Sequence, residues 1–186
     1  LLPATDRDVT MVFQSYALFP HMSVLENVSY GLKMAGIKKE ESHEKSIKTL
    51  ELIGLQNFES RMPSELSGGQ QQRVAVARAI VLEPKVLLFD EPLSNLDAKL
   101  RRQVREDIRG IQQKLGVTTI YVTHDQEEAL AISDKVIVMN EAIIAQEGSP
   151  KNLYHNPETK FVANFIGDSN IVKARIETKD DSQYKI

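Results

Sequence analysis

Short apolar runs alternate with longer amphipathic segments along the chain. The apolar runs occupy residues 9–13, 86–89 and 117–122, and each has the length of a single strand. The run at 86–89 contains no polar residue, which predicts a strand buried on both faces of a parallel sheet. The pattern therefore predicts an α/β fold built on a parallel sheet.

Helices are predicted where apolar residues recur every three or four positions and capping residues mark the ends. Ser23 and Glu26 have the spacing of a capping box, and Gly54 and Gly116 are suited to end helices. The expected helices are 23–35, 40–55, 70–82, 98–115 and a segment that ends at 132. A strand pair at 135–139 and 142–146 follows, then two short helices and a strand at 170–177.

Two adjacent carboxylates end the central run. Asp90 and Glu91 lie at the carboxyl edge, where open α/β sheets hold their ligands. Adjacent residues of an extended chain point in opposite directions, so the two acids can serve different roles. Asp90 suits Mg²⁺, which prefers hard oxygen ligands, and Glu91 suits the polarisation of an attacking water. The alternative is that both are ordinary solvated residues at a strand end.

The other two runs are also followed by polar side chains. Gln14 follows the first run, and its neutral amide oxygen can ligate Mg²⁺. His124 follows the third run, and a histidine can donate a hydrogen bond whether neutral or protonated. Asp125 and Glu128 suit a capping box that opens the next helix. For Gln14 and His124 the alternative role is that of a strand-end or capping residue.

A serine and two glycines open the helix predicted at 70–82. A serine beside free backbone amides at a helix N-terminus makes an anion site, and glycines allow close backbone approach. A helix cap alone is the alternative. The residues concerned are Ser67, Gly68, Gly69 and Gln70.

The loop at 94–97 precedes the longest predicted helix. Its last residue, Asp97, is predicted to cap the helix at 98–115. That helix is rich in lysine, arginine and acidic residues, which predicts a solvated face.

Together these motifs resemble the ATP-binding subunits of ABC (ATP-binding cassette) transporters. The signature sequence at 66–70, the strand that ends in Asp90 and Glu91, the loop at 94–97 and His124 follow one another in the order of that family. The resemblance implies a partial P-loop NTPase core with a parallel sheet, ATP and Mg²⁺ as ligands, and a homodimer of two ATPase subunits.

The resemblance also implies a role for each motif. Glu91 would activate water, while His124 and the partner's signature residues (Ser67, Gly68, Gly69 and Gln70) would hold the γ-phosphate. Asp90 and Gln14 would hold Mg²⁺, Gln14 would also sense the γ-phosphate, and the loop ending at Asp97 would touch the second subunit. Residues 15–22 would form part of the groove that receives a membrane subunit.

Four segments follow from the resemblance. Residues 1–20 would belong to the ATPase core and 21–83 to an inserted helical subdomain with the signature sequence. Residues 84–166 would return to the core, and 167–186 would start a C-terminal OB-like regulatory domain. Relatives usually carry a glycine near Ala142, which is absent here.

The phosphate-binding loop of this family, G-x-x-x-x-G-K-[ST], does not occur in the 186 residues. Its absence leads us to expect that the chain is an N-terminally truncated piece of a longer ATPase and is inactive by itself. The competing hypothesis is a non-catalytic interaction module.

The loop at 95–98 and the junction at 165–170 most resemble the iron(III) and polyamine branch of importers. Ferric iron is therefore the first expectation for the cargo, with polyamine, sugar or phosphonate as alternatives. The implied partners are membrane permease subunits and, indirectly, a periplasmic or extracellular solute-binding protein. A DNA-repair ATPase of the same superfamily is disfavoured, because no sustained heptads interrupt the chain.

Composition narrows the picture further. The net charge of −3 and the lack of a long basic block argue against nucleic acid as a partner. The absence of cysteine excludes disulfides, thiolate metal sites and cysteine nucleophiles. No apolar run approaches the length of a membrane span. We therefore expect a peripheral protein at the cytoplasmic face of the inner or plasma membrane.

Overall fold

The computed structural model describes residues 3, 7–167, 169–172, 178–180 and 183–185. The chain divides into two compact units, residues 1–132 and 133–186. The first unit contains every residue predicted to take part in the ATP site. The subdivision predicted from the family resemblance stays a prediction.

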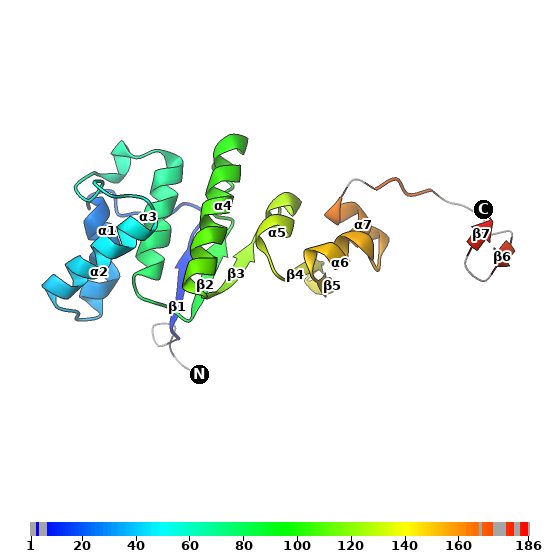
Figure 1. The fold of residues 1–186 in the computed structure, drawn as a ribbon, viewed down its shortest axis with the longest axis horizontal. Helices are drawn as coiled ribbons and strands as arrows, with labels where there is room; N and C mark the ends of the chain where they lie inside the picture. Colours follow the sequence, from blue (N-terminus) through cyan, green and yellow to red (C-terminus); the bar gives the residue numbers. More distant parts are fainter. Residues whose placement is uncertain (1–2, 4–6, 168, 173–177, 181–182, 186) are drawn as a thin grey trace. The chain divides into compact units, whose positions relative to one another are not determined.

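A three-stranded parallel sheet forms the centre of the first unit (Figure 1). Its strands are β1 (Val9–Val12), β2 (Val86–Asp90) and β3 (Thr118–Val122), in the order β1-β2-β3. Val12 pairs with Phe89, which in turn pairs with Tyr121, so the three strands end at one edge. The prediction of an α/β fold with a parallel sheet is confirmed.

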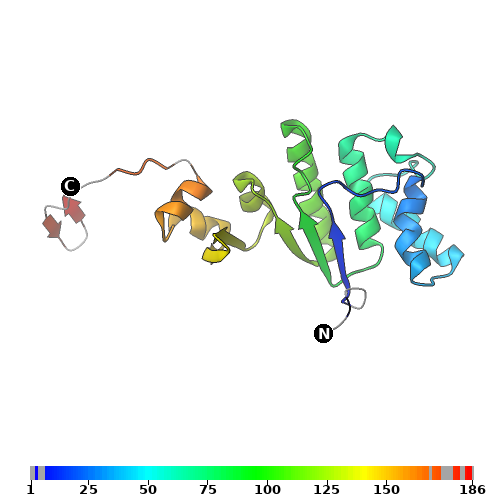
Figure 2. The ribbon, with the colours of Figure 1, turned by 180° about the vertical axis from the view of Figure 1, so that it is seen from behind.

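Helices cover one face of the sheet, and no helix in the described part of the first unit covers the other (Figure 2). Leu87 and Phe89 of β2 are buried in the same hydrophobic cluster as Val104 and Ile108 of α4. Met11, Ile120 and Val122, which alternate with the residues paired to Leu87 and Phe89, are exposed. On that face Val86 and Leu88 of β2 are only partly buried. The prediction that β2 is fully buried on both faces is therefore wrong for the described residues, because an apolar run shows that a strand can be buried and does not show that a layer covers it.

Three α-helices and a short 3-10 helix lie between β1 and β2. They are α1 (Val24–Met34), α2 (Lys39–Leu52), the 3-10 helix η2 (Pro63–Glu65) and α3 (Gly68–Ile80). The Ser23 hydroxyl accepts from the Glu26 amide, and the Glu26 carboxylate accepts from the Ser23 amide, so the predicted capping box is present. Val28 of α1, Leu50 of α2 and Val74 of α3 are fully buried and join these helices to the core of the sheet.

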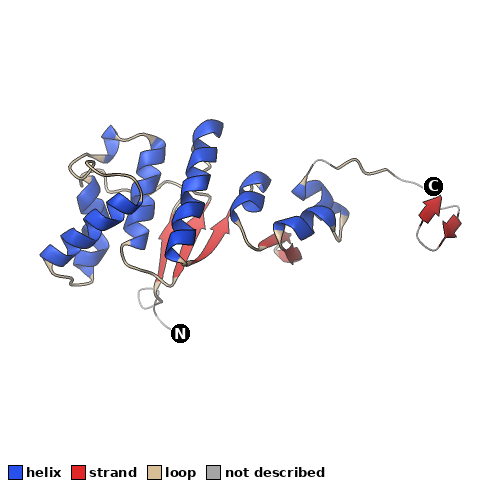
Figure 3. Cartoon of the chain, viewed as in Figure 1, coloured by secondary structure: helices blue, strands red, loops and turns tan. Residues whose placement is uncertain are grey.

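Two further helices alternate with the strands, as Figure 3 shows. They are α4 (Ala98–Leu115), which precedes β3, and α5 (Gln126–Ile132), which follows it. The α4 helix buries Val104, Ile108 and Ile111 and ends at Gly116, whose φ of 62° lies in the left-handed region. Of the eight charged side chains of α4, four are exposed (Lys99, Arg102, Glu106 and Lys114) and four are partly buried (Arg101, Arg105, Asp107 and Arg109).

The partly buried charges of α4 depart from the predicted solvated face. Arg101 and Asp107 are partly buried and form ion pairs with Asp125 and Arg73. Their partners are distant in sequence, so the composition of the helix alone could not separate these two charges from the exposed ones.

The second unit begins with an antiparallel pair, β4 (Val136–Asn140) and β5 (Ile143–Gly148). The two residues between these strands, Glu141 and Ala142, have φ values of 48° and 63°. Positive φ at both central positions is typical of the two-residue hairpin turn that favours glycine. The turn therefore forms without glycine, at a cost in backbone strain.

Two short helices, α6 (Pro150–His155) and α7 (Lys160–Ile166), follow the hairpin. A second antiparallel pair is formed by β6 (Thr178–Asp180) and β7 (Gln183–Lys185). Residues 170–172 of the strand predicted at 170–177 are not in a strand, and the remaining five lie outside the described residues. Within the part of the chain that the structure describes, no helix has the length and apolarity needed to cross a membrane.

Candidate functional site

Glu91 lies where β2 turns away from the sheet. Its amide donates to the carbonyl of Val122 at 3.0 Å, which extends the pairing of β2 with β3 by one residue. Its φ of 43° is in the left-handed region, which costs a non-glycine residue about 1–2 kcal/mol. Strain of this kind concentrates at functional sites, where the surrounding structure holds it. The Glu91 side chain keeps 32% of its surface exposed at the edge of the sheet.

His124 reaches Glu91 from the neighbouring strand end. Its Nδ1 lies 3.2 Å from Glu91 Oε2, and its side chain is 75% exposed. The pairing follows from the topology, because the ends of adjacent parallel strands meet at one edge. The structure thus brings together two of the side chains predicted from sequence to be catalytic.

Gln14 joins the same edge through the loop that follows β2. Its Nε2 donates to the Ser94 hydroxyl at 3.1 Å, and the side-chain Nδ2 of Asn95 donates to the backbone carbonyl of Gln14 at 3.0 Å. The Ser94 hydroxyl donates in turn to the Glu91 carbonyl at 3.0 Å. A continuous set of hydrogen bonds therefore connects Gln14, Ser94 and the backbone of Glu91, although Gln14 and Ser94 are 80 residues apart.

Asp90 ends β2 on the opposite side from Phe89. Asp90 and the amide oxygen of Gln14 are hard oxygen donors at neighbouring strand ends, and the Gln14–Ser94 bond uses the amide nitrogen. Among the described residues there is no cluster of three or more histidine, cysteine or acidic side chains that could enclose a metal. Mg²⁺ usually keeps several waters and takes one or two protein ligands besides substrate phosphates, so this donor set fits it.

Ser67 caps α3, as the sequence predicts. Its hydroxyl accepts from the Gln70 amide at 3.4 Å, and its amide donates to Gln70 Oε1 at 2.9 Å. A methyl group on Gly69 would lie 2.9 Å from Leu100 Cδ1, and one on Gly68 would lie 3.1 Å from a methyl group of Leu96. The two glycines thus allow the start of α3 to approach the chain on both sides of Asp97.

Asp97 caps α4, as predicted. Its carboxylate accepts from the Leu100 amide at 2.9 Å. Both helix starts are therefore explained by capping, and binding of an anion by Ser67, Gly68, Gly69 and Gln70 stays a prediction.

Two arginines that support this edge were not predicted from the sequence. Arg78 of α3 donates to the carbonyls of Tyr16 and Ala17, at 3.0 and 2.7 Å, and holds the turn that follows Gln14. Burial lowers the pKa of the Arg78 guanidinium. Arg101 of α4 contacts the segment around His124. Tyr16, Ala17 and Asp125 lie at least 24 residues from the arginines that contact them, so no local pattern indicates these contacts.

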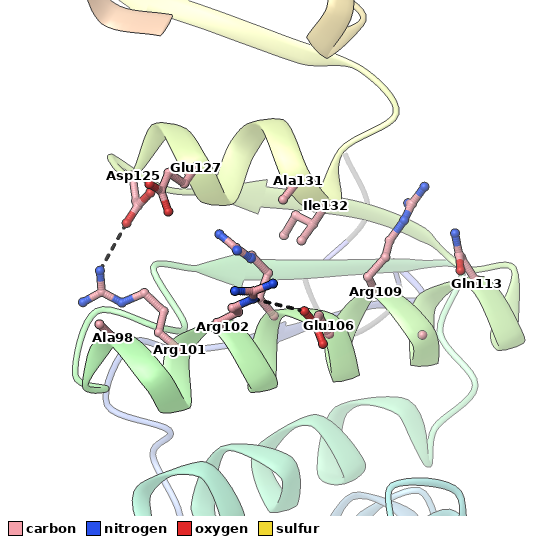
Figure 4. A pocket seen from close by; sticks show the side chains of 12 residues that line it. Ala98, Arg101, Arg102, Glu106, Arg109, Gln113, Asp125, Glu127, Ala131 and Ile132 are labelled. Carbon is pink, nitrogen blue, oxygen red and sulfur yellow. Dashed lines mark hydrogen bonds and ion pairs between the residues drawn. The ribbon is translucent and has the colours of Figure 1, made fainter. Parts of the chain in front are cut away.

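A groove of about 600 Å³ lies between α4 and α5 (Figure 4). Arg102, Arg105 and Arg109 line it from α4, while Glu127 and Ile132 line it from α5. It lies beside the Arg101–Asp125 pair and contains none of the predicted catalytic side chains. The candidate site is therefore the exposed sheet edge and not this groove.

A parallel sheet with an acid pair, a glutamine and a histidine at its carboxyl edge defines the class of ABC ATPase cores. The sequence pattern of the family described as ABC transporter matches residues 2–94, half of the chain. The chain belongs to the ABC transporter family.

Its relatives include proteins named for iron import. The Fe(3+) ions import ATP-binding protein FbpC of Agrobacterium fabrum is 60% identical over 188 aligned positions, covering 100% of this chain and 53% of that protein. The protein of the same name in Brucella melitensis is 60% identical over 182 positions, with 98% and 52% covered. The chain spans about half the length of these curated relatives.

A solved structure supports the fold. The structure of cbiO1 from Clostridium perfringens, described as part of the ABC transporter complex cbiONQ, has a TM-score of 0.74 and 32% sequence identity. The match covers 82% of this chain and 61% of that one.

Proposed function

We propose that the protein containing this chain is the ATP-hydrolysing subunit of an ABC importer, with ferric iron as the cargo. The observation that carries the ATPase assignment is the pairing of Glu91 with His124, 3.2 Å apart at the carboxyl edge of β2 and β3. The similarity to Fe(3+) import ATP-binding proteins favours iron over polyamine, sugar or phosphonate.

Glu91 is the base that this edge offers to an attacking water. A carboxylate that accepts a hydrogen bond from water orients it and accepts its proton as the water oxygen bonds to phosphorus. The strained turn at φ 43° ends the strand here and turns the chain at the sheet edge. Glu91 thereby activates the water that attacks the γ-phosphate.

His124 lies between this carboxylate and the open solvent. When its ring is protonated, both nitrogens donate, so Nδ1 can bond Glu91 while Nε2 bonds a phosphate oxygen. The side chain is 75% exposed, which leaves room for a nucleotide beside it. His124 is therefore the γ-phosphate contact.

Asp90 and the amide oxygen of Gln14 would hold Mg²⁺, which neutralises charge on the nucleotide phosphates when bound. Gln14 also senses whether nucleotide is bound, because its side-chain nitrogen bonds Ser94 and its backbone carbonyl accepts from Asn95, both in the loop after β2. Arg78 donates to the carbonyls of Tyr16 and Ala17 in the turn after Gln14, so a displacement of Gln14 moves the segment 15–22. This segment passes the movement to a membrane permease.

The start of α3 would complete the site of a second copy of the protein. Free amides and the helix dipole favour an anion at this N-terminus, so the signature residues Ser67, Gly68, Gly69 and Gln70 bind the γ-phosphate held by the partner subunit. The loop ending at Asp97 touches that partner. The homodimer lies at the cytoplasmic face of the membrane, against permease subunits that receive solute from a binding protein.

Substitution of Glu91 in the whole protein tests the assignment. Glu91→Gln keeps the size of the side chain and removes the base, so kcat for ATP should fall about 10²–10⁴-fold while ATP still binds. Dimers with trapped ATP should appear on size-exclusion chromatography. Uptake of radioactive ferric iron by cells that depend on this protein should stop.

Glu106→Gln is the matched control, because Glu106 is an exposed acid of α4 that pairs with Arg102. Wild-type turnover by Glu91→Gln would contradict the base assignment. If cells that carry Glu91→Gln lose uptake of polyamine, sugar or phosphonate and keep iron uptake, the lost solute is the cargo in place of ferric iron. If the wild-type protein binds no ATP, the interaction-module hypothesis is favoured.

A further inference from the structure

Arg101 of α4 joins two loops that carry the proposed catalytic groups. Its Nη2 donates to the carbonyl of Leu96 at 3.2 Å, in the loop that also contains Ser94 and Asp97. Its Nη1 lies 3.1 Å from Asp125 Oδ2, as Figure 4 shows. One planar guanidinium thus spans the loop after β2 and the turn after β3, a geometry that suits arginine and not lysine.

A buried carboxylate lies behind the same guanidinium. Glu128 has a side chain only 4% exposed, and its Oε1 lies 3.9 Å from Arg101 Nε. Its other oxygen accepts from the Thr123 hydroxyl at 2.8 Å and from the Tyr121 hydroxyl at 3.1 Å. A carboxylate this buried requires hydrogen bonds and a positive charge nearby, and Arg101 provides the charge.

Side-chain contacts hold Thr123 and Asp125, the residues on either side of His124, in place. Thr123 is bonded to Glu128, and its hydroxyl accepts from the Asp125 amide at 3.0 Å. Asp125 is paired with Arg101 and caps the Glu128 amide at 3.1 Å. His124 itself is 75% exposed, so packing contributes little to its position.

We propose that Arg101 is a positioning residue that holds the turn of His124 in register with the loop after β2, so that the imidazole stays at Glu91. The inference rests on the proposed ATPase function of this site. Arg101 bonds Leu96 in the loop of Ser94, Ser94 bonds the Glu91 carbonyl, Glu91 contacts His124, and Asp125 beside His124 pairs with Arg101, so the contacts form a closed ring. Removal of Arg101 opens this ring at the point where the two loops meet.

Substitutions in the whole protein separate positioning from general stabilisation. Arg101→Gln should lower kcat on the order of 10-fold or more, because small displacements of a reacting group are costly, and should leave KM for ATP nearly unchanged. Arg101→Lys keeps the positive charge but lacks the planar group that bonds two partners at once. Its kcat should therefore lie between that of the wild type and that of Arg101→Gln. Arg102→Gln is the matched control, since Arg102 is 77% exposed and pairs with Glu106.

A double-mutant cycle with His124→Ala shows whether Arg101 acts through the histidine. In the His124→Ala background, Arg101→Gln should have little further effect on kcat. An equal loss in both backgrounds would overturn the proposal, because it would mean that Arg101 supports the fold or the site independently. Should Arg101→Gln not fold, Asp125→Asn keeps the oxygen that caps α5 and removes the charge that faces Arg101.

NMR of the imidazole provides a readout that does not depend on ATP hydrolysis. The His124 ring resonances, assigned with His124→Asn, should shift and broaden in Arg101→Gln and stay unchanged in Arg102→Gln. Unchanged resonances together with unchanged kcat would refute the positioning role while the ATPase assignment stands. A wild-type protein without ATPase activity but with the expected resonance changes would refute the proposed function alone.

Discussion

The hydroxyl of Tyr121 should couple the stability of the first unit to alkaline pH. This hydroxyl donates to the buried Glu128 carboxylate at 3.1 Å, from a ring packed against Phe89. Burial, and then the negative charge of Glu128, raise the pKa of Tyr121 well above its usual value of 10. Folding therefore favours the neutral phenol.

The magnitude follows from the linkage between protonation and folding. Below pH 10 both the folded and the unfolded states hold the proton, and Tyr121→Phe should cost about 1.5–3 kcal/mol for the lost bond to a charged acceptor. Above pH 10 only the unfolded tyrosine ionises, so the wild type loses stability as pH rises. At pH 11 this loss is about 1.4 kcal/mol, and Tyr121→Phe does not share it.

Urea unfolding of wild type and Tyr121→Phe, followed by circular dichroism from pH 8 to pH 11, measures the effect. The difference in the free energy of unfolding between the two proteins should shrink by about 1.4 kcal/mol over that range. Thr123→Val is the control, because it removes the other side-chain donor to Glu128 and introduces no titration. A difference between wild type and Tyr121→Phe that stays constant with pH would refute the reasoning.

Two further predictions concern backbone positions. Gly69→Ala should change the stability of the protein by less than about 1 kcal/mol, because its methyl group would lie 2.9 Å from Leu100 Cδ1, the end of a side chain that can move aside and so offset the usual gain of alanine over glycine in a helix. Gly110→Ala is the matched helical control, with nothing within 4 Å, and should stabilise by about 0.5–1 kcal/mol; thermal unfolding of both checks the contrast. Ala142→Gly should stabilise by about 1 kcal/mol, since Ala142 has a φ of 63°, and an unchanged or lower melting temperature would contradict the strain at this turn.

The sequence by itself determined the local elements and the chemistry at the strand ends. Apolar runs located β1, β2 and β3, and capping residues such as Ser23 and Asp97 located the helix starts within a few residues. These signals act over three or four positions, which makes them readable from the chain alone. The proximity of Glu91 and His124 was also predictable, because parallel strands end at a common edge.

Only the tertiary structure decided which distant side chains pair beneath that edge. The contact of Gln14 with Ser94 spans 80 residues, and that of Arg101 with Asp125 spans 24. Nothing in the composition of α4 distinguishes Arg101 from the exposed Arg102, because the difference lies in the direction each side chain takes from the packed helix. The sequence could not predict the exposed face of the sheet either. A run of apolar residues shows that a strand can be buried, and only the packing of other elements determines whether a layer covers it.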